Sequence, residues 1–396
     1  MQRVSKPIYL DYNATTPVDP DVLKAMSPYL QEHFGNPSSS HDYGRTTKEA
    51  VEKARQQVAN LISASPEEIV FTSGGSESDN TAIIGVALAN MGRMKKGGHV
   101  ITSRIEHPAV LESARYLEDR LGFKVTYLPV DNYGLVNPSD VSGAITDDTI
   151  LITIMHANNE VGTIQPVEEI GNIARENGVL FHTDAAQSCG KIEVDVNRMN
   201  VDLLAIAGHK MYAPKGIGVL YVRNGTEIDS YIHGAGHESG RRAGTENVPY
   251  IVGLGAASRI AKNMLPSFAT RVKDLRNKLY TGILEGIGQE KVRLNCHPEN
   301  RLPNTLNISL RGIIGEKLLS EIPEIAASTG SACHSGLFKP SDVLLEMGLA
   351  KEEALGALRL SLGRGTSEEE IEIASKLIVE RYVKESAAKE QNVPQV

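Results

Sequence analysis

Residues 178–210, GVLFHTDAAQSCGKIEVDVNRMNVDLLAIAGHK, contain two apolar runs that each end in a polar residue able to do chemistry. The first run predicts a β-strand that ends at Asp184, and the second predicts a strand that is followed directly by Lys210. In an open α/β sheet, ligands bind beyond the carboxyl ends of the strands. One ligand can therefore contact both Asp184 and Lys210, and this stretch favours a sheet that carries a site at one edge.

The sequence on both sides of this stretch alternates short apolar runs with amphipathic helical patterns. Further strands are predicted in EEIVFTSG (67–74), HVITSRIEH (99–107), KVTYLPV (124–130), TILITIMHANN (149–159) and GVLYV (218–222). Helical patterns lie between them, as in TTKEAVEKARQQVANLI, PAVLESARYLEDRLG and VEEIGNIARENG. This rhythm is typical of an α/β fold with a mostly parallel sheet.

After about residue 260 the pattern changes. A long helix is predicted over 257–287, with Pro266 as a candidate break, followed by a strand in RLPNTLNISL (301–310) and a late helix. We expect a large domain over 16–260 and a smaller α+β domain made of 1–15 and 261–396.

Composition excludes several classes of protein. The chain has 396 residues, a formal net charge of −8 and 41% hydrophobic residues, so general disorder is excluded. No apolar run approaches the roughly 18 to 20 residues of a membrane span, and no Lys/Arg cluster forms a basic face for nucleic acid. The N-terminus lacks the apolar stretch of a signal peptide, and three scattered cysteines without a CxxC pair predict neither disulfides nor a metal site. A cytoplasmic protein is expected.

Lys210 and Asp184 are the first candidate site residues. A lysine is usually a surface charge, but one that follows an apolar strand can lose its proton on desolvation and attack a carbonyl group. Asp184 is either the N-cap of a helix or the counter-ion of a protonated pyridine nitrogen.

Two further strand ends carry candidate ligand-binding groups. TSGGSES (72–78) joins a strand to a helix predicted over 79–91, and its glycines and the helix N-terminus can hold a phosphate. The same segment can also be a simple turn. His107, which ends another strand, is either an ordinary satisfied histidine or a group that stacks on a planar ring or moves protons.

The C-terminal part contributes a cysteine and an arginine. Cys333 lies in STGSACHSG (328–336), a segment of small residues that is unlike the usual buried setting of cysteine, although it can be an incidental thiol. Cys189 is interpreted as a core residue, and Cys296 as surface or core. Arg359 has two interpretations. It is an ordinary arginine, exposed or ion-paired, or its guanidinium group binds a substrate carboxylate.

Together these features resemble the pyridoxal-phosphate-dependent cysteine desulfurases of the NifS/IscS type, in the aminotransferase class V family. The resemblance covers residues 10–366. The strings that carry it are YLDYNATTPV, GNPSSSH, FTSGGSESDN, EHPAV, ANNEVGTIQPV, HTDAAQ, GHKMYAPKGIG, RAGTEN, LPNT and GSACHS.

This resemblance implies a type I fold, with a seven-stranded sheet in the large domain, and pyridoxal 5′-phosphate (PLP) as the cofactor. Lys210 matches the lysine that forms the Schiff base with it, Asp184 the partner of the ring nitrogen, and His107 the residue that stacks on the ring and transfers protons. The other implied cofactor contacts are Gly75, Ser76 and His209 at the phosphate, and Asn159 and Gln187 at the ring substituents.

The resemblance also implies the substrate and partners. Thr245 matches a phosphate contact that is donated by the other subunit of a homodimer. Arg359, with Asn159, matches the substrate-binding residues, and Cys333 matches the nucleophile that receives sulfur as a persulfide. The implied reaction converts L-cysteine to L-alanine, with sulfur passed to an acceptor or an iron–sulfur scaffold protein.

Three alternatives remain. Cys333-His334-Ser335 and RLPNTLNISLRG also resemble selenocysteine lyases, which release selenide from L-selenocysteine. Gly253-Leu254-Gly255 has two glycines of a dinucleotide-binding motif, but it lies inside a helical pattern. A degenerate member that acts only as a binding platform would not be expected to keep Lys210, Asp184 and Cys333 together.

Overall fold

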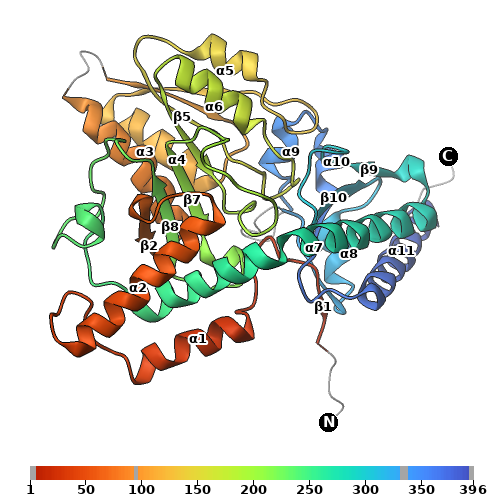
Figure 1. Ribbon diagram of the computed structural model, residues 1–396. Coiled ribbons are helices and arrows are strands. Elements are labelled where there is room, and N and C mark those ends of the chain that lie inside the picture. Colours follow the sequence, from red (N-terminus) through yellow and green to blue (C-terminus); the bar gives the residue numbers. More distant parts are fainter. Residues whose placement is uncertain (1–5, 93–96, 331–337, 392–396) are drawn as a thin grey trace.

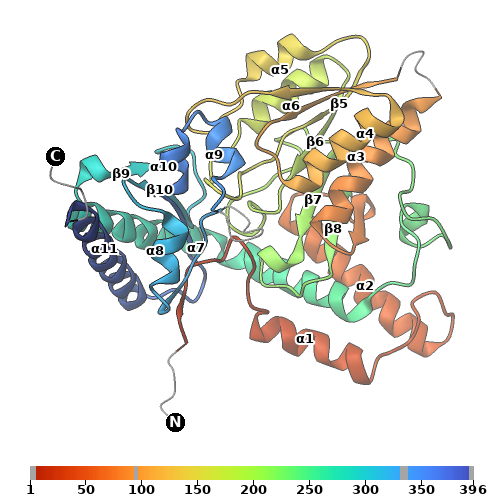
Figure 2. The same cartoon turned by 180° about the vertical axis from the view of Figure 1, so that it is seen from behind.

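A computed structural model of the chain describes residues 6–92, 97–330 and 338–391. Figures 1 and 2 show two parts: a large part built on a central sheet and a smaller part that contains the last helix.

The central sheet has seven strands in the order β2-β8-β7-β6-β5-β3-β4. Every neighbouring pair from β7 to β4 is parallel, and β8 runs antiparallel to both β7 and β2. Its strands are β2 (Ile69–Thr72), β3 (His99–Ser103), β4 (Lys124–Leu128), β5 (Thr149–Thr153), β6 (Leu180–Asp184), β7 (Leu203–Ala207) and β8 (Gly218–Val222). The predicted α/β fold with a mostly parallel seven-stranded sheet is confirmed.

Helices cover both faces of this sheet, which explains why β3, β5, β7 and β8 are buried along their whole length. Apolar residues of α3 and α4 form the core on one face, and those of α1, α2, α5, α6 and the start of α7 form the core on the other. The helices are α1 (Pro20–Gln31), α2 (Asp42–Leu61), α3 (Gly75–Met91), α4 (Pro108–Leu121), α5 (Pro138–Ala144), α6 (Val167–Glu176) and α7 (Val248–Ile287).

The smaller part has its own core. A three-stranded antiparallel sheet, β12-β10-β9, packs against α11 and the second half of α7. The N-terminal strand joins this part, because β1 pairs in parallel with β11 and Leu10 is buried in the same core. The elements are β1 (Ile8–Tyr9), β9 (Val292–Leu294), β10 (Thr305–Leu310), α8 (Gly315–Ser320), β11 (Ile325–Ala326), α9 (Asp342–Glu346), α10 (Lys351–Leu355), β12 (Ala357–Ser361) and α11 (Glu368–Gln391).

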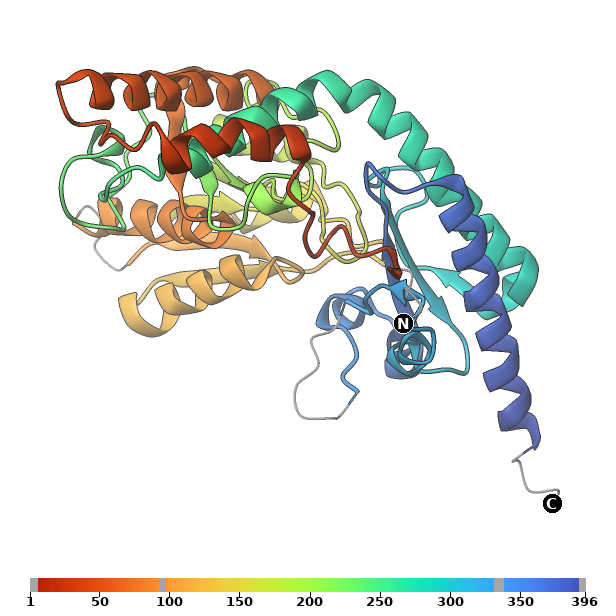
Figure 3. The ribbon, with the colours of Figure 1, turned by 90° about the horizontal axis from the view of Figure 1, so that it is seen from below.

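Helix α7 connects the two parts without interruption (Figure 3). The predicted break at Pro266 is wrong: the proline lies inside one continuous helix of 40 residues. A proline in a helix interior costs about 3 kcal/mol. The helix persists because the segment before Pro266 is buried in the core of the large part and the segment after it in the core of the smaller part.

The glycine pair of the dinucleotide-like motif has a packing role in α7. A Cβ on Gly255 would lie 2.6 Å from the Cα of Ala54 in α2, so glycine lets these two helices approach closely. The motif does not follow a strand, as a dinucleotide-binding turn would.

We propose the domain division expected from the sequence, with 16–260 as the large domain and 1–15 with 261–396 as the smaller one. The two separate cores support it. No helix in the described part of the chain combines the length and hydrophobicity that crossing a membrane requires.

Candidate active site

A cavity of about 400 Å³ lies at the carboxyl-terminal edge of the central sheet. Residues that end or follow β3, β5, β6 and β7 line it, together with residues of the N-terminal segment and of β12. The structure brings most of the predicted site residues together here: Gly75, Ser76, His107, Asn159, Asp184, Gln187, His209, Lys210 and Arg359.

Lys210 lies in the short turn Gly208–Lys210, directly after β7. Its Nζ donates hydrogen bonds to the backbone oxygens of Asn13, at 2.7 Å, and Ala14, at 2.8 Å. Burial, reinforced by the positive charge of Arg359, lowers the pKa of Lys210 to about 8. The amine is thus far easier to deprotonate than an ordinary lysine, as a nucleophile for a carbonyl group requires.

This lowered pKa predicts how Lys210 responds to pH in the cofactor-free protein. Only the neutral amine reacts with an acylating reagent, so the labelling rate of Lys210 should reach half its maximum near pH 8. Exposed Lys215, five residues later, is the internal control. Competitive labelling with peptide mass spectrometry measures both, and identical profiles for the two lysines would contradict the prediction.

Asp184 and His107 both line the cavity, and a ligand atom of each lies within 4.8 Å of the other. One Asp184 carboxylate oxygen accepts the backbone N–H of Ala186 at 2.8 Å, and burial raises the pKa of this carboxyl while His107 and Lys210 act against the rise. His107 is the N-cap of α4, where its Nδ1 accepts the N–H of Ala109 at 3.1 Å. Burial lowers the pKa of His107, so the ring is neutral near pH 7 and carries its proton on Nε2.

Asp79, in α3, is a site residue that the sequence reasoning missed. It is buried and lines the cavity, and single ligand atoms of Asp79, His107 and Asp184 all lie within 4.8 Å of one another. Burial, with the neighbouring charges of Asp184 and Glu106, raises the pKa of Asp79 well above its usual value.

The surroundings of Asp79 show which carboxyl of this group is the anion. Its Oδ1 lies 3.6 Å from Nε2 of His182, whose pKa burial lowers to about 3, so no positive charge meets Asp79 there. Asp184, by contrast, faces the amine of Lys210, which is still largely charged near pH 7. The negative charge of the pair therefore lies on Asp184. The string FTSGGSESDN contained Asp79, but nothing in it indicated burial.

The N-terminus of α3 faces the cavity through Gly75 and Ser76. The helix begins at Gly75 and not at Asp79 as predicted, and its N-cap, Gly74, offers no side-chain hydrogen bond to the first N–H groups. A Cβ on Gly75 would lie 3.2 Å from the Cβ of Ala207, so glycine allows α3 to start against the end of β7. These N–H groups and the helix dipole make an anion site.

His209 contributes a neutral ring to the same cavity. Its Nδ1 lies 3.1 Å from Oγ1 of Thr15, within hydrogen-bond distance. Burial, followed by the charge of Lys210, lowers the pKa of His209 to about 4. At neutral pH, His209 can therefore hydrogen-bond an anion without adding a charge.

Asn13 is the second residue that the sequence reasoning missed. Its backbone oxygen accepts hydrogen bonds from Lys210 and from Nε2 of Gln187, the latter at 3.0 Å, and its Nδ2 donates to the backbone oxygen of Asn159 at 3.2 Å. The N-terminal segment thus holds three residues of the cavity wall in place. Its string, YLDYNATTPV, pointed to the family but not to this contact.

Arg359 reaches the cavity from β12 in the smaller part. It donates through Nη2 to Asp11, at 2.9 Å, and through Nη1 to the backbone oxygen of Asn159, at 3.3 Å. Its Nε is buried and has no hydrogen-bond partner among the described residues. The guanidinium is therefore positioned with donor capacity left for a carboxylate.

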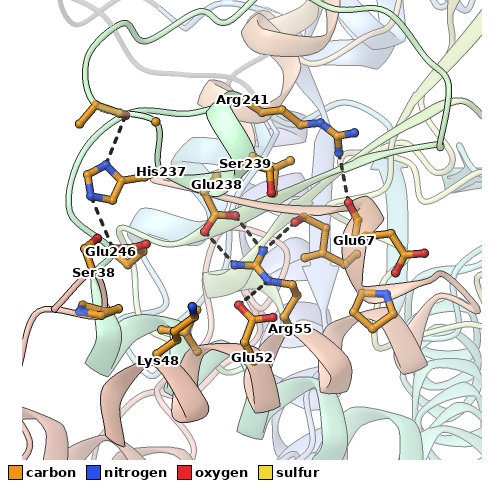
Figure 4. A pocket seen from close by; sticks show the side chains of 17 residues that line it. Ser38, Lys48, Glu52, Arg55, Glu67, His237, Glu238, Ser239, Arg241 and Glu246 are labelled. Atoms are coloured by element: carbon orange, nitrogen blue, oxygen red, sulfur yellow. Dashed lines mark hydrogen bonds and ion pairs between the residues drawn. The ribbon is translucent and has the colours of Figure 1, made fainter. Parts of the chain in front are cut away.

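Thr245 is exposed and is not among the residues that line this cavity. Its neighbour Glu246 lines a second cavity of about 720 Å³, shown in Figure 4. There, Nη1 and Nη2 of Arg55 donate hydrogen bonds to the carboxylate of Glu238, at 2.8 and 2.9 Å. This pair anchors the segment that leads to Thr245. The predicted role of Thr245 in a partner subunit stays a prediction.

Two of the three cysteines, Cys189 and Cys296, lie in the described part of the chain, and both are buried. Cys333 lies outside the described residues. Cys189 is buried, as predicted, and burial raises the pKa of its thiol strongly. Cys296, which the sequence left between surface and core, is fully buried, and Arg301 donates a hydrogen bond to its sulfur.

The residues that line the cavity fit three distinctive groups of PLP: the aldehyde, the pyridine nitrogen and the phosphate. Lys210 supplies an amine of lowered pKa for the aldehyde, and Asp184 a buried carboxylate for the pyridine nitrogen. The uncapped start of α3 supplies N–H donors for the phosphate. The volume of about 400 Å³ lies in the range of cofactor pockets.

Comparisons with known proteins agree with this geometry. The aminotransferase class-V family model matches residues 8–373. A curated relative named cysteine desulfurase IscS, from Clostridium botulinum, is 48% identical over 384 residues, which are 96% of each chain. A solved NifS-like protein superposes with a TM-score of 0.87 at 40% identity, covering 94% of this chain and 98% of its own.

A second solved structure, SspA in complex with cysteine, has a TM-score of 0.78 at 42% identity and covers 89% of this chain and 98% of its own. Family model, sequence relatives and solved structures thus extend over nearly the whole chain. The chain belongs to the aminotransferase class-V family, among its NifS- and IscS-type cysteine desulfurases.

Proposed function

We propose that this protein is a PLP-dependent cysteine desulfurase, which converts L-cysteine to L-alanine and passes the sulfur to Cys333. The observation that carries the proposal is the meeting of Lys210, Asp184 and the start of α3 in one cavity. This is the arrangement that PLP chemistry needs, in a chain 48% identical to a named cysteine desulfurase.

The chain's own residues would divide the work as follows. Bound PLP supplies an electron sink for the carbon atoms of the substrate. Asp184 holds the ring nitrogen in its protonated form, because a buried carboxylate favours a cation beside it. Lys210 Nζ moves a proton to and from the substrate Cα, a task suited to an amine with a pKa of about 8. The His107 ring, which lines the cavity and carries its proton on Nε2, would pack on the cofactor.

The remaining residues would bind and orient the cofactor and the substrate. Gly75, Ser76 and His209 would bind the phosphate. Gln187 and Asn159 would hydrogen-bond the ring substituents. Arg359, assisted by Asn159, would bind the carboxylate of cysteine.

Cys333 is proposed as the sulfur acceptor of the first step. Its thiolate attacks the sulfur of the substrate, an S–S bond forms, and the Cβ–S bond breaks. The electron pair of that bond stays with the substrate carbon, which takes up a proton, so that alanine and a persulfide on Cys333 result.

The comparisons do not favour selenocysteine lyase. Several curated relatives that match over nearly the whole chain are named cysteine desulfurases, and one solved structure similar to this chain is a complex with cysteine. Only two short strings, Cys333-His334-Ser335 and RLPNTLNISLRG, carried the alternative.

We further propose that the protein acts as a cytoplasmic homodimer and delivers sulfur to an acceptor or an iron–sulfur scaffold protein. The exposed position of Thr245, on a segment anchored by Arg55 and Glu238, supports a contact with a second copy. A monomeric mass by light scattering, together with full activity, would contradict the dimer.

The function is tested by the products of the reconstituted protein. Wild type should release alanine from L-cysteine in proportion to the sulfur recovered after reduction. Asp184→Ala should lose far more turnover than cofactor, because its hydrogen bond contributes about 1.5–3 kcal/mol to binding, whereas the loss of the ring proton weakens the electron sink itself. The absence of alanine from PLP-loaded wild type would refute the function, and equal losses of occupancy and rate would reduce Asp184 to a cofactor anchor.

A further inference from the structure

Lys191 is a buried lysine that contacts two residues lining the cavity, Gln187 and Asn13, and the proposed mechanism does not use it. Only 5% of its surface is exposed, and none of the residues that the structure describes forms an ion pair with it. Its Nζ donates to Oε1 of Gln187 at 2.7 Å and to Oδ1 of Asn13 at 3.1 Å. Burying an amine is costly, so two hydrogen bonds to neutral amides indicate a specific task.

The first consequence concerns the amide of Gln187. A carboxamide can present either its oxygen or its nitrogen to a ligand, and the two orientations have almost the same shape. Lys191 donates to Oε1, which fixes the oxygen on the buried side. Nε2 is then the end left to donate, and it already donates to the backbone oxygen of Asn13 at 3.0 Å.

Asn13 does not depend on Lys191 in the same way. Its Oδ1 also accepts a hydrogen bond from Nδ2 of Asn304 at 3.0 Å, and its Nδ2 donates to Oγ1 of Thr305 at 2.9 Å. These contacts hold the Asn13 amide in one orientation without the lysine. Gln187 has one other contact of this kind, from its Nε2 to the backbone oxygen of Asn13, whereas the Asn13 amide has two, so loss of Lys191 is expected to affect Gln187 more than Asn13.

We propose that Lys191 is a positioning residue that locks the amide of Gln187, so that its NH₂ group, and not its oxygen, meets the oxygen substituent of the cofactor ring. This inference rests on the proposed function, in which Gln187 contacts the ring. A ring oxygen with negative charge accepts a hydrogen bond from Nε2 but is repelled by Oε1. The two hydrogen bonds that Lys191 donates need only two N–H hydrogens. Lys191 can therefore hold the Gln187 amide in this orientation whether its amine is neutral or charged.

The test is a double-mutant cycle on PLP binding, with Lys191→Met and Gln187→Ala. Methionine keeps the length and apolar volume of the lysine stem but cannot donate. In the wild-type background, Lys191→Met should weaken PLP binding about tenfold, measured by titration of the cofactor-free protein and by the cofactor absorbance. In the Gln187→Ala background the same change should weaken binding less than about twofold, because the amide it orients is gone.

Two controls separate orientation from general damage. Lys376→Met, on the surface of α11, should leave the affinity for PLP unchanged. Gln187→Glu keeps an oxygen for Lys191 but removes the NH₂ group, so it should weaken PLP binding at least as much as Gln187→Ala. This variant leaves Lys191 in place, so if Lys191→Met does not fold it still tests the premise that the NH₂ group of Gln187 is the end that meets the ring.

The results distinguish a wrong role for Lys191 from a wrong function for the protein. Equal losses from Lys191→Met in both backgrounds, or wild-type affinity in Gln187→Glu, would overturn the role assigned to Lys191. These results would leave the proposed function intact as long as wild type binds PLP and releases alanine. If wild type does neither, the proposed function itself fails.

Discussion

Replacing Lys210 with alanine should abolish turnover of L-cysteine while the protein still binds PLP without a covalent link. The amine is the group of lowered pKa that lies at the end of β7, and the proton at the substrate Cα has no other assigned acceptor of comparable basicity. General acid–base groups contribute about 10²- to 10⁴-fold to rates, and Lys210 also holds the cofactor. We expect a loss of at least about 10³-fold. Asp184, His107 and the start of α3 remain to hold PLP.

Measurement of alanine release, with cofactor occupancy determined after gel filtration, checks this expectation. Lys215→Ala is the matched control, because Lys215 is an exposed lysine of the same segment. It should keep wild-type activity. Turnover of cysteine at the wild-type rate by Lys210→Ala would refute the assignment of the site.

Replacing Cys333 with alanine should eliminate alanine formation from L-cysteine. The Cβ–S bond is hard to break unless a nucleophile takes the sulfur, and Cys333 is the cysteine proposed to do so. Selenocysteine is a useful probe, because its C–Se bond is weaker and the selenol more acidic. Cys333→Ala should keep measurable activity on selenocysteine.

Mass spectrometry of cysteine-treated wild type should find the added sulfur on the peptide that contains Cys333. Cys189→Ala and Cys296→Ala are the matched controls. Both thiols are buried in cores, where no substrate sulfur can reach them, so both variants should keep most of their activity. Added sulfur on either residue, or desulfuration of cysteine at the wild-type rate by Cys333→Ala, would show that the nucleophile is wrongly assigned.

The sequence alone was sufficient to predict the α/β sheet and the edge at which the site lies. Hydrophobic alternation is a local property, and each of Asp184, His107 and Lys210 follows or ends a strand that the local pattern already indicates. The carboxyl ends of parallel strands lie at one edge of the sheet, so the local sequence pattern is enough to predict that these three residues lie together.

The termini of elements were predicted less well than their existence. Helix α3 begins four residues before the predicted start, because the glycine and serine that look like a turn are its first residues. Helix α7 passes through Pro266, because cores on both sides of the proline hold it. Packing outweighed the local signal in both places.

Only the tertiary structure decided the contacts between segments that are far apart in the chain. Arg359 pairs with Asp11, and Asn13 accepts hydrogen bonds from both Lys210 and Lys191. Sequence periodicity states which face of an element is buried, but it does not state which distant side chain meets it there. The long-range packing of the N-terminal segment and β12 against the sheet edge brings these polar groups into contact, and burial there lowers the pKa of Lys210.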